Sequence, residues 1–111
     1  MQKNNTTAPE DTTPAKKEMV VKISSTQKFS YFVTETDTVT NDFVTKDDYD
    51  VTSLDYTFTP KGGHKVIIEA VSTPTATFTT NITYNGKALG PIVPVKDASH
   101  TSFVFNYVVP K

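Results

Sequence analysis

Residues 54–71 read LDYTFTPKGGHKVIIEAV, and this stretch indicates the fold class. At its start apolar and polar side chains alternate, so Leu54, Tyr56 and Phe58 share one face of an extended strand. The PKGG segment that follows is typical of a turn. Residues 64–71 are then apolar on both faces, which predicts a central strand covered on two sides. The combination predicts antiparallel all-β structure.

The same alternation recurs through the chain of 111 residues. Further strands are predicted at residues 19–23, 29–33, 78–84, 87–95 and 103–109. Asn85-Gly86 favours a type I′ hairpin turn, because both positions tolerate positive φ. Pro91 and Pro94 cannot donate to a ladder, so residues 87–95 should form an edge strand or a broken one. About seven strands, with no helix longer than one turn, predict an immunoglobulin-like antiparallel β-sandwich.

The alternation also predicts the core. Val104 and Val108 should face away from the interior, opposite the aromatic face of the last strand. Eight residues are expected to be mostly buried: Tyr56, Phe58, Val66, Ile68, Phe78, Ile82, Phe103 and Phe105.

Composition divides the chain into a tether, residues 1–17, and a β-sandwich domain, residues 18–111. The first part holds threonine, proline and charged residues, with no apolar side chain larger than alanine between residues 2 and 17. Such a stretch buries too little surface to offset its ordering entropy, so we expect a flexible, disordered N-terminal tether.

Several function classes lack support in the composition. The net charge is −1 and all eleven basic residues are lysines, so neither a basic field nor an arginine fork favours nucleic acid. There is no cysteine, which excludes thiol chemistry and disulfides. The two histidines, His64 and His100, each lie beside a turn signal and are expected to be solvated loop residues, and no serine lies in a G-x-S-x-G elbow. We therefore expect a protein that is not an enzyme, with no bound cofactor.

The acidic segment, residues 34–51, is the hardest to place, and is either a ragged edge strand or a long crossover between sheets. A calcium site is one interpretation, because clustered carboxylates supply the hard oxygen ligands that calcium prefers. Its ligands would be Asp42, Asp47, Asp48 and Asp50. The segment lacks the glycine and terminal glutamate of a known calcium loop, so a charged edge that prevents aggregation is the other interpretation. Phe43 and Tyr49 lie among these acids and are candidate ligand-binding aromatics.

Two segments resemble known families. The opening QKNNTTAPED, residues 2–11, resembles the stretch after the lipidated cysteine in small surface lipoproteins of Bacteroidetes-type bacteria. The resemblance implies export and an N-terminal lipid anchor on a cysteine that precedes Gln2. Residues 57–66 and 81–87, with their Lys-Gly turn and Tyr-Asn-Gly-Lys ending, are similar to the sandwich domains of MmpS-like exported proteins. In size and in the Gly-Gly turn the chain also resembles immunoglobulin-like cysteine-protease inhibitors, but their Asn-Pro-Thr-Thr-Gly loop is missing.

These observations predict a non-catalytic module of the cell envelope that binds a protein or glycan, or has a structural role. The alternatives are a calcium-dependent adhesion or carbohydrate-binding accessory domain, and subunit pairing through edge strands. Contact with the membrane is expected only through the N-terminal lipid anchor.

Overall fold

The fold is a single antiparallel sheet of seven strands, seen in a computed structural model that describes residues 17–111. The predicted tether at residues 1–17 lies almost wholly outside the described residues. The strands are β1 (Met19–Thr36), β2 (Phe43–Phe58), β3 (Lys65–Ser72), β4 (Phe78–Tyr84), β5 (Lys87–Ala88), β6 (Val95–Lys96) and β7 (Thr101–Val108). Residues 17–111 include no helix long and apolar enough to cross a membrane.

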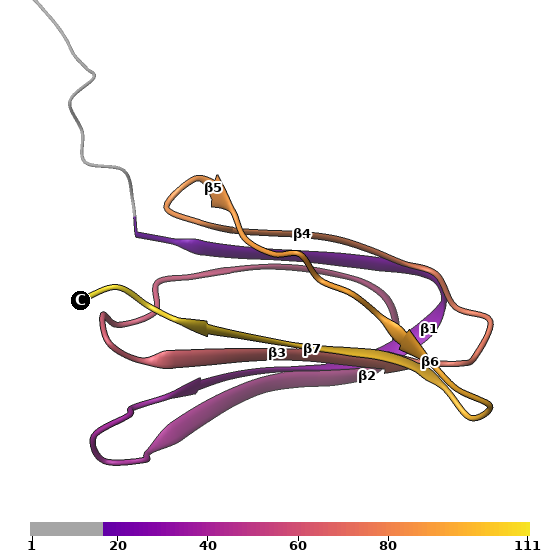
Figure 1. The fold of residues 1–111 in the computed structure, drawn as a ribbon, viewed down its shortest axis with the longest axis horizontal. Helices are drawn as coiled ribbons and strands as arrows, with labels where there is room; N and C mark the ends of the chain where they lie inside the picture. Colours follow the sequence, from indigo (N-terminus) through magenta and orange to yellow (C-terminus); the bar gives the residue numbers. More distant parts are fainter. Residues whose placement is uncertain (1–16) are drawn as a thin grey trace, which may run out of the picture.

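The long strand β1 organises the sheet. Along one side it pairs with β2, from Met19 opposite Phe58 to Thr36 opposite Phe43. On its other side the first half of β1 pairs with β4 and the second half pairs with β3. The register shifts at residues 25–28, where β1 bends between these two partners (Figure 1). The strand order is therefore β5-β4-β1-β3-β7-β6, with β2 attached to β1.

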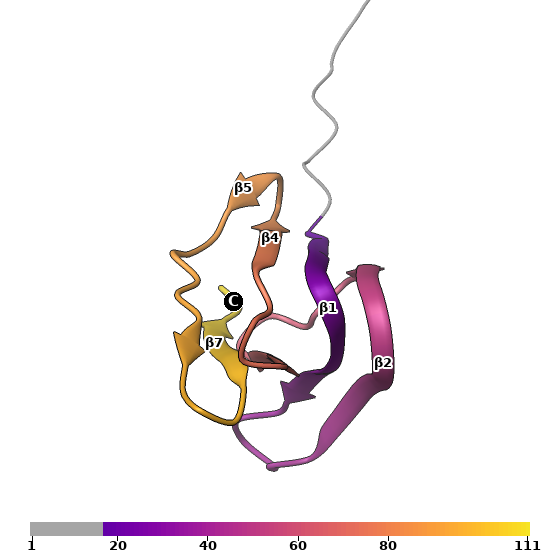
Figure 2. The same cartoon turned by 90° about the vertical axis from the view of Figure 1, so that its right-hand side faces the viewer.

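The bend curls the sheet into a half-barrel (Figure 2). Its closure is visible in aromatic contacts between β4 and β7, which are not hydrogen-bonded neighbours. The ring centroids of Phe78 and Phe103 lie 5.3 Å apart, and those of Tyr84 and Tyr107 lie 5.6 Å apart. Near the start of β4, Lys96 donates from Nζ to the carbonyl oxygen of Ala76 at 2.8 Å. These contacts hold the two ends of the sheet around one core.

The core confirms most of the predicted faces. Val66, Ile68, Ile82 and Phe103 are buried as expected, and Val104 and Val108 are exposed. The other four expected core residues, Tyr56, Phe58, Phe78 and Phe105, are half-buried and pack against the core. The inner face of β1 adds six alternating residues to the core: Met19, Val21, Ile23, Phe29, Tyr31 and Val33.

Several strand predictions are confirmed and others are corrected. The turn at Asn85-Gly86 has positive φ at both positions, 55° and 78°. The proline-containing segment is broken into β5 and β6, as the missing amide donors predict. β3 is central in the sheet, but its outer face is not covered, because Val71 keeps 37% of its surface exposed. The all-β antiparallel class is confirmed, whereas the immunoglobulin-like sandwich is not, because all seven strands belong to one curled sheet.

Candidate functional site

The free edge of β2 is the most distinctive surface of the described chain. β2 runs for 16 residues and pairs with β1 alone, so no strand within residues 17–111 covers its other edge. Its first half, Phe43–Asp50, is exposed at every position. The acidic segment is therefore not a crossover: residues 34–36 end β1, residues 37–42 form the hairpin turn, and residues 43–51 are an edge strand whose backbone polar groups face solvent along one side.

A bulge limits the regular part of this edge. Tyr31 lies opposite Asp48 and Phe29 lies opposite Val51, so two residues of β2 face only Ser30 of β1. One of the two bulged residues is Asp50, whose φ is 56°. Asp48 caps the bulge by accepting a hydrogen bond at 2.8 Å on Oδ1 from the next backbone N–H. Because a bulge interrupts pairing, the regular free edge before it is Phe43–Asp48.

The side chains of this regular edge alternate between two faces. On the outer face, the Thr45 and Thr34 hydroxyls lie 3.1 Å apart, and in the adjacent bulge the Tyr49 ring packs edge-on against Phe32 with centroids 5.8 Å apart. On the inner face, Lys46 Nζ lies 5.0 Å from the centroid of the Tyr56 ring. Side chains on both faces of the edge are therefore positioned by contacts with neighbouring residues.

The four aspartates considered as calcium ligands lie along this edge, but not around one point. Asp47 faces outward opposite Phe32, Asp48 faces inward opposite Tyr31, and Asp42 lies in the turn before β2. Within residues 17–111 no three histidine, cysteine or acidic side chains are grouped so that they could hold a metal ion. Calcium binding at Asp42, Asp47, Asp48 and Asp50 remains a prediction.

The two aromatic candidates are both exposed, Phe43 by 66% and Tyr49 by 58%. Phe43 begins the regular edge and Tyr49 lies in the bulge after its other end, and the two rings have no contact with each other. They do not form one stacking platform. Each can instead flank a segment that lies along the edge.

A cluster of one histidine and two carboxylates lies at the turn end of the β1–β2 hairpin. His64 Nδ1 lies 2.7 Å from Glu35 Oε2, and His64 Nε2 lies 3.6 Å from Asp37 Oδ2. Glu35 Oε2 also accepts the backbone N–H of Lys61 at 2.9 Å. Backbone N–H groups of the turn lower the pKa of Asp37, since they donate to its carboxylate. His64 is therefore not a solvated loop histidine, because its side chain is only 19% exposed and faces two carboxylates.

An open pocket of about 240 Å³ adjoins this cluster and reaches the start of β2. It is lined by Glu35, Asp37, Asp42, Phe43, Val44 and His64. Three carboxylates and no lysine line it, so it extends the negative surface of the edge. Sequence patterns alone do not reveal this arrangement, because Glu35 and His64 are separated by 29 positions and meet only through the pairing of β1 with β3.

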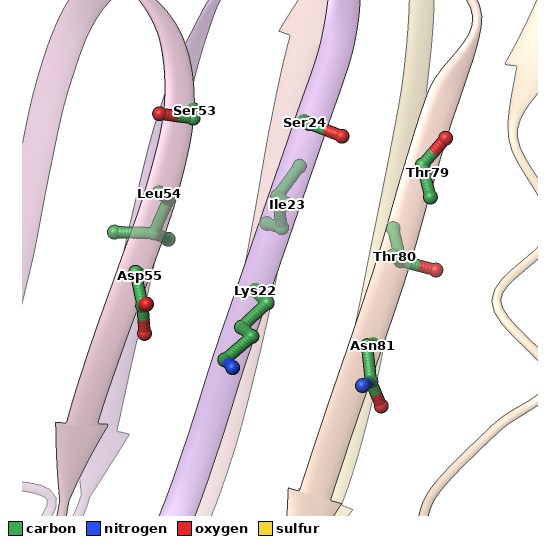
Figure 3. A pocket seen from close by; sticks show the side chains of 9 residues that line it. All are labelled: Lys22, Ile23, Ser24, Ser53, Leu54, Asp55, Thr79, Thr80 and Asn81. Carbon is green, nitrogen blue, oxygen red and sulfur yellow. The ribbon is translucent and has the colours of Figure 1, made fainter.

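A second open pocket, of about 300 Å³, lies on the outer face of the sheet across β2, β1 and β4 (Figure 3). Its outward-pointing side chains are Lys22, Ser24, Ser53, Asp55, Thr79 and Asn81. No aromatic side chain lines it, so it lacks the stacking surface that sugars favour. A polar outer face of this kind is ordinary for an antiparallel sheet.

The chain was also compared with models of known protein families, with curated proteins and with solved structures. None of the three comparisons gave a match.

Proposed function

We propose that the protein is a non-catalytic binding module that takes an extended segment of a partner protein as an additional strand on β2. The observation that carries this proposal is the free edge of β2, which is 16 residues long and paired on one side only. Strand addition uses backbone hydrogen bonds for affinity and the alternating side chains for specificity. The regular stretch Phe43–Asp48 offers both.

The surroundings of this edge support the binding of a partner strand, because the usual ways of protecting a free edge do not cover its regular part. A long free edge is a liability that proteins usually shorten, bulge or cover. Here the bulge at Asp50 comes only after Phe43–Asp48, and no strand of the described chain covers those residues. Phe43 and Val44 also remain 66% and 70% exposed, which suits apolar contacts with an added strand.

The absence of catalysis is part of the proposal. Both ring nitrogens of His64 face carboxylates, Glu35 and Asp37, in a shallow pocket open to solvent. General acid–base catalysis needs such a group to reach a bound substrate. The location at the cell envelope rests on the lipoprotein-like N-terminal segment, and an immunoglobulin-like relationship rests on strand number and chain length.

The test is a selection of linear heptapeptides on the purified protein, followed by mapping of the binding site by amide chemical shifts. We expect the selected peptides to shift the amides of Phe43–Asp48 and to slow the hydrogen exchange of those whose N–H groups point away from β1, because an added strand supplies carbonyl acceptors to them. Amides of β3 are the internal control, since β3 is paired on both sides. Shifts confined to another surface, such as the pocket around Lys22 and Asp55, would contradict the proposal.

A further inference from the structure

We infer that the strand accepted by β2 is cationic, with two adjacent basic residues that face Asp47 and Asp48. This inference rests on the proposed function, because it concerns the partner of the same edge. Residues 42–50 contain four aspartates and one lysine. The pocket beside Phe43 adds Glu35 and Asp37 to the same negative surface.

A second copy of the chain fits this edge poorly. Two-fold pairing of β2 with itself would bring eight aspartates and two lysines together along residues 42–50 of the two copies. Like charges on adjacent strands destabilise pairing. The charge that disfavours self-pairing favours a strand of opposite sign.

The side-chain pattern of β2 defines the partner further. Asp47 and Asp48 are consecutive, so they lie on opposite faces of the sheet, and matching cations must also be consecutive. Phe43 and Val44 lie at the other end of the regular edge, where apolar residues of the added strand would pack. An antiparallel partner therefore has a basic pair first and an apolar pair about three positions later.

The probe is the acetylated, amidated octapeptide TKKNTVVT, with three matched peptides. TQQNTVVT removes the charge, TEENTVVT reverses it, and a TKKNTVVT peptide with N-methylated alternate amides keeps the charge but removes backbone pairing. We expect TKKNTVVT to shift the amides of Phe43–Asp48, with an affinity that falls as salt rises. TEENTVVT and the methylated peptide should not bind there, and TQQNTVVT should bind about three- to tenfold more weakly.

Variants of the protein test whether the lysines of the peptide face Asp47 and Asp48. Asp47→Asn combined with Asp48→Asn should weaken TKKNTVVT about three- to tenfold and leave TQQNTVVT unchanged. Asp55→Asn is the matched control, because Asp55 is exposed on the second half of the same strand and should change the affinity less than twofold. Thermal melting of each variant checks that the fold is retained.

The outcomes separate this inference from the proposed function. Equal binding of TKKNTVVT and TQQNTVVT at Phe43–Asp48 would overturn the cationic partner and leave strand addition in place. Binding of the methylated peptide as tightly as its parent would overturn strand addition, as would shifts in none of the β2 amides with any peptide. Concentration-dependent dimerisation through β2 in light scattering would show that the occupant is a second copy, and would overturn the inference.

Discussion

Replacement of Phe29 by alanine should be among the most damaging substitutions in the protein. Phe29 is 1% exposed and lies next to the bend of β1, opposite Val51 of β2 and Ser72 of β3. Its ring also meets Phe78 edge-on, with centroids 5.6 Å apart. Truncation of a buried phenylalanine costs about 3–5 kcal/mol, and the lost aromatic pair places Phe29→Ala in the upper part of that range.

The comparison that tests this reasoning is Phe105→Ala, because Phe105 is the same residue type but only half-buried. We expect a cost of about 1–3 kcal/mol for Phe105→Ala, since less apolar surface returns to water. Urea denaturation, monitored by circular dichroism, measures the loss in free energy of unfolding for both variants. If Phe29→Ala does not fold, Phe29→Leu, with an expected cost of about 1–2 kcal/mol, replaces it. A larger loss for Phe105→Ala than for Phe29→Ala would refute the assignment of the core.

Three further predictions concern turns and charges. Gly86→Val should destabilise the protein by about 1–3 kcal/mol through backbone strain alone, because φ is 78° and a Cβ there would meet no atom within 4 Å; Gly86→Asn should cost less in the same thermal melts. Because the pKa of Asp37 is lowered in the folded protein, its carboxylate stabilises the fold fully above the unfolded pKa of 3.8, and this contribution is lost as pH falls through the lower folded pKa. The Asp37→Asn variant should therefore lose less stability than the parent protein in acid titrations. His64→Ala should cost about 1–3 kcal/mol, because the partly buried Glu35 carboxylate loses its side-chain partner and keeps only the backbone N–H of Lys61; an equal cost of His64→Ala in a Glu35→Gln background would contradict this.

The sequence predicted strands well where alternation was unbroken, and poorly where polar residues interrupted it. Residues 24–28 are all polar and were expected to separate two strands, yet β1 continues through them. These residues lie at the bend and most are exposed, so their polarity marks a change of partner rather than an end of pairing. In β2 the exposed residues of Phe43–Asp50 similarly hid a strand, because an edge with two solvated faces has no alternation to detect.

The candidate site could be predicted only in part for a related reason. The position of Phe43 and Tyr49 in an acidic edge follows from local sequence, and the structure places both on β2. The contact of His64 with Glu35 depends on which strands become neighbours and in which register, and single-sequence patterns do not contain that information. The freedom of the β2 edge depends on the order of strands in the whole sheet for the same reason.

The placement of β1 between two partners has a mechanical consequence. The first half of β1 begins at Met19 and is hydrogen-bonded to β2 on one side and to β4 on the other. A force applied through the chain that precedes Met19 would pull along the strand axis and load both ladders in shear. Many backbone hydrogen bonds would then have to break together, whereas a pull perpendicular to an edge would open them one pair at a time. The strand that organises the sheet is thus also the strand best suited to bear tension from the N-terminal side.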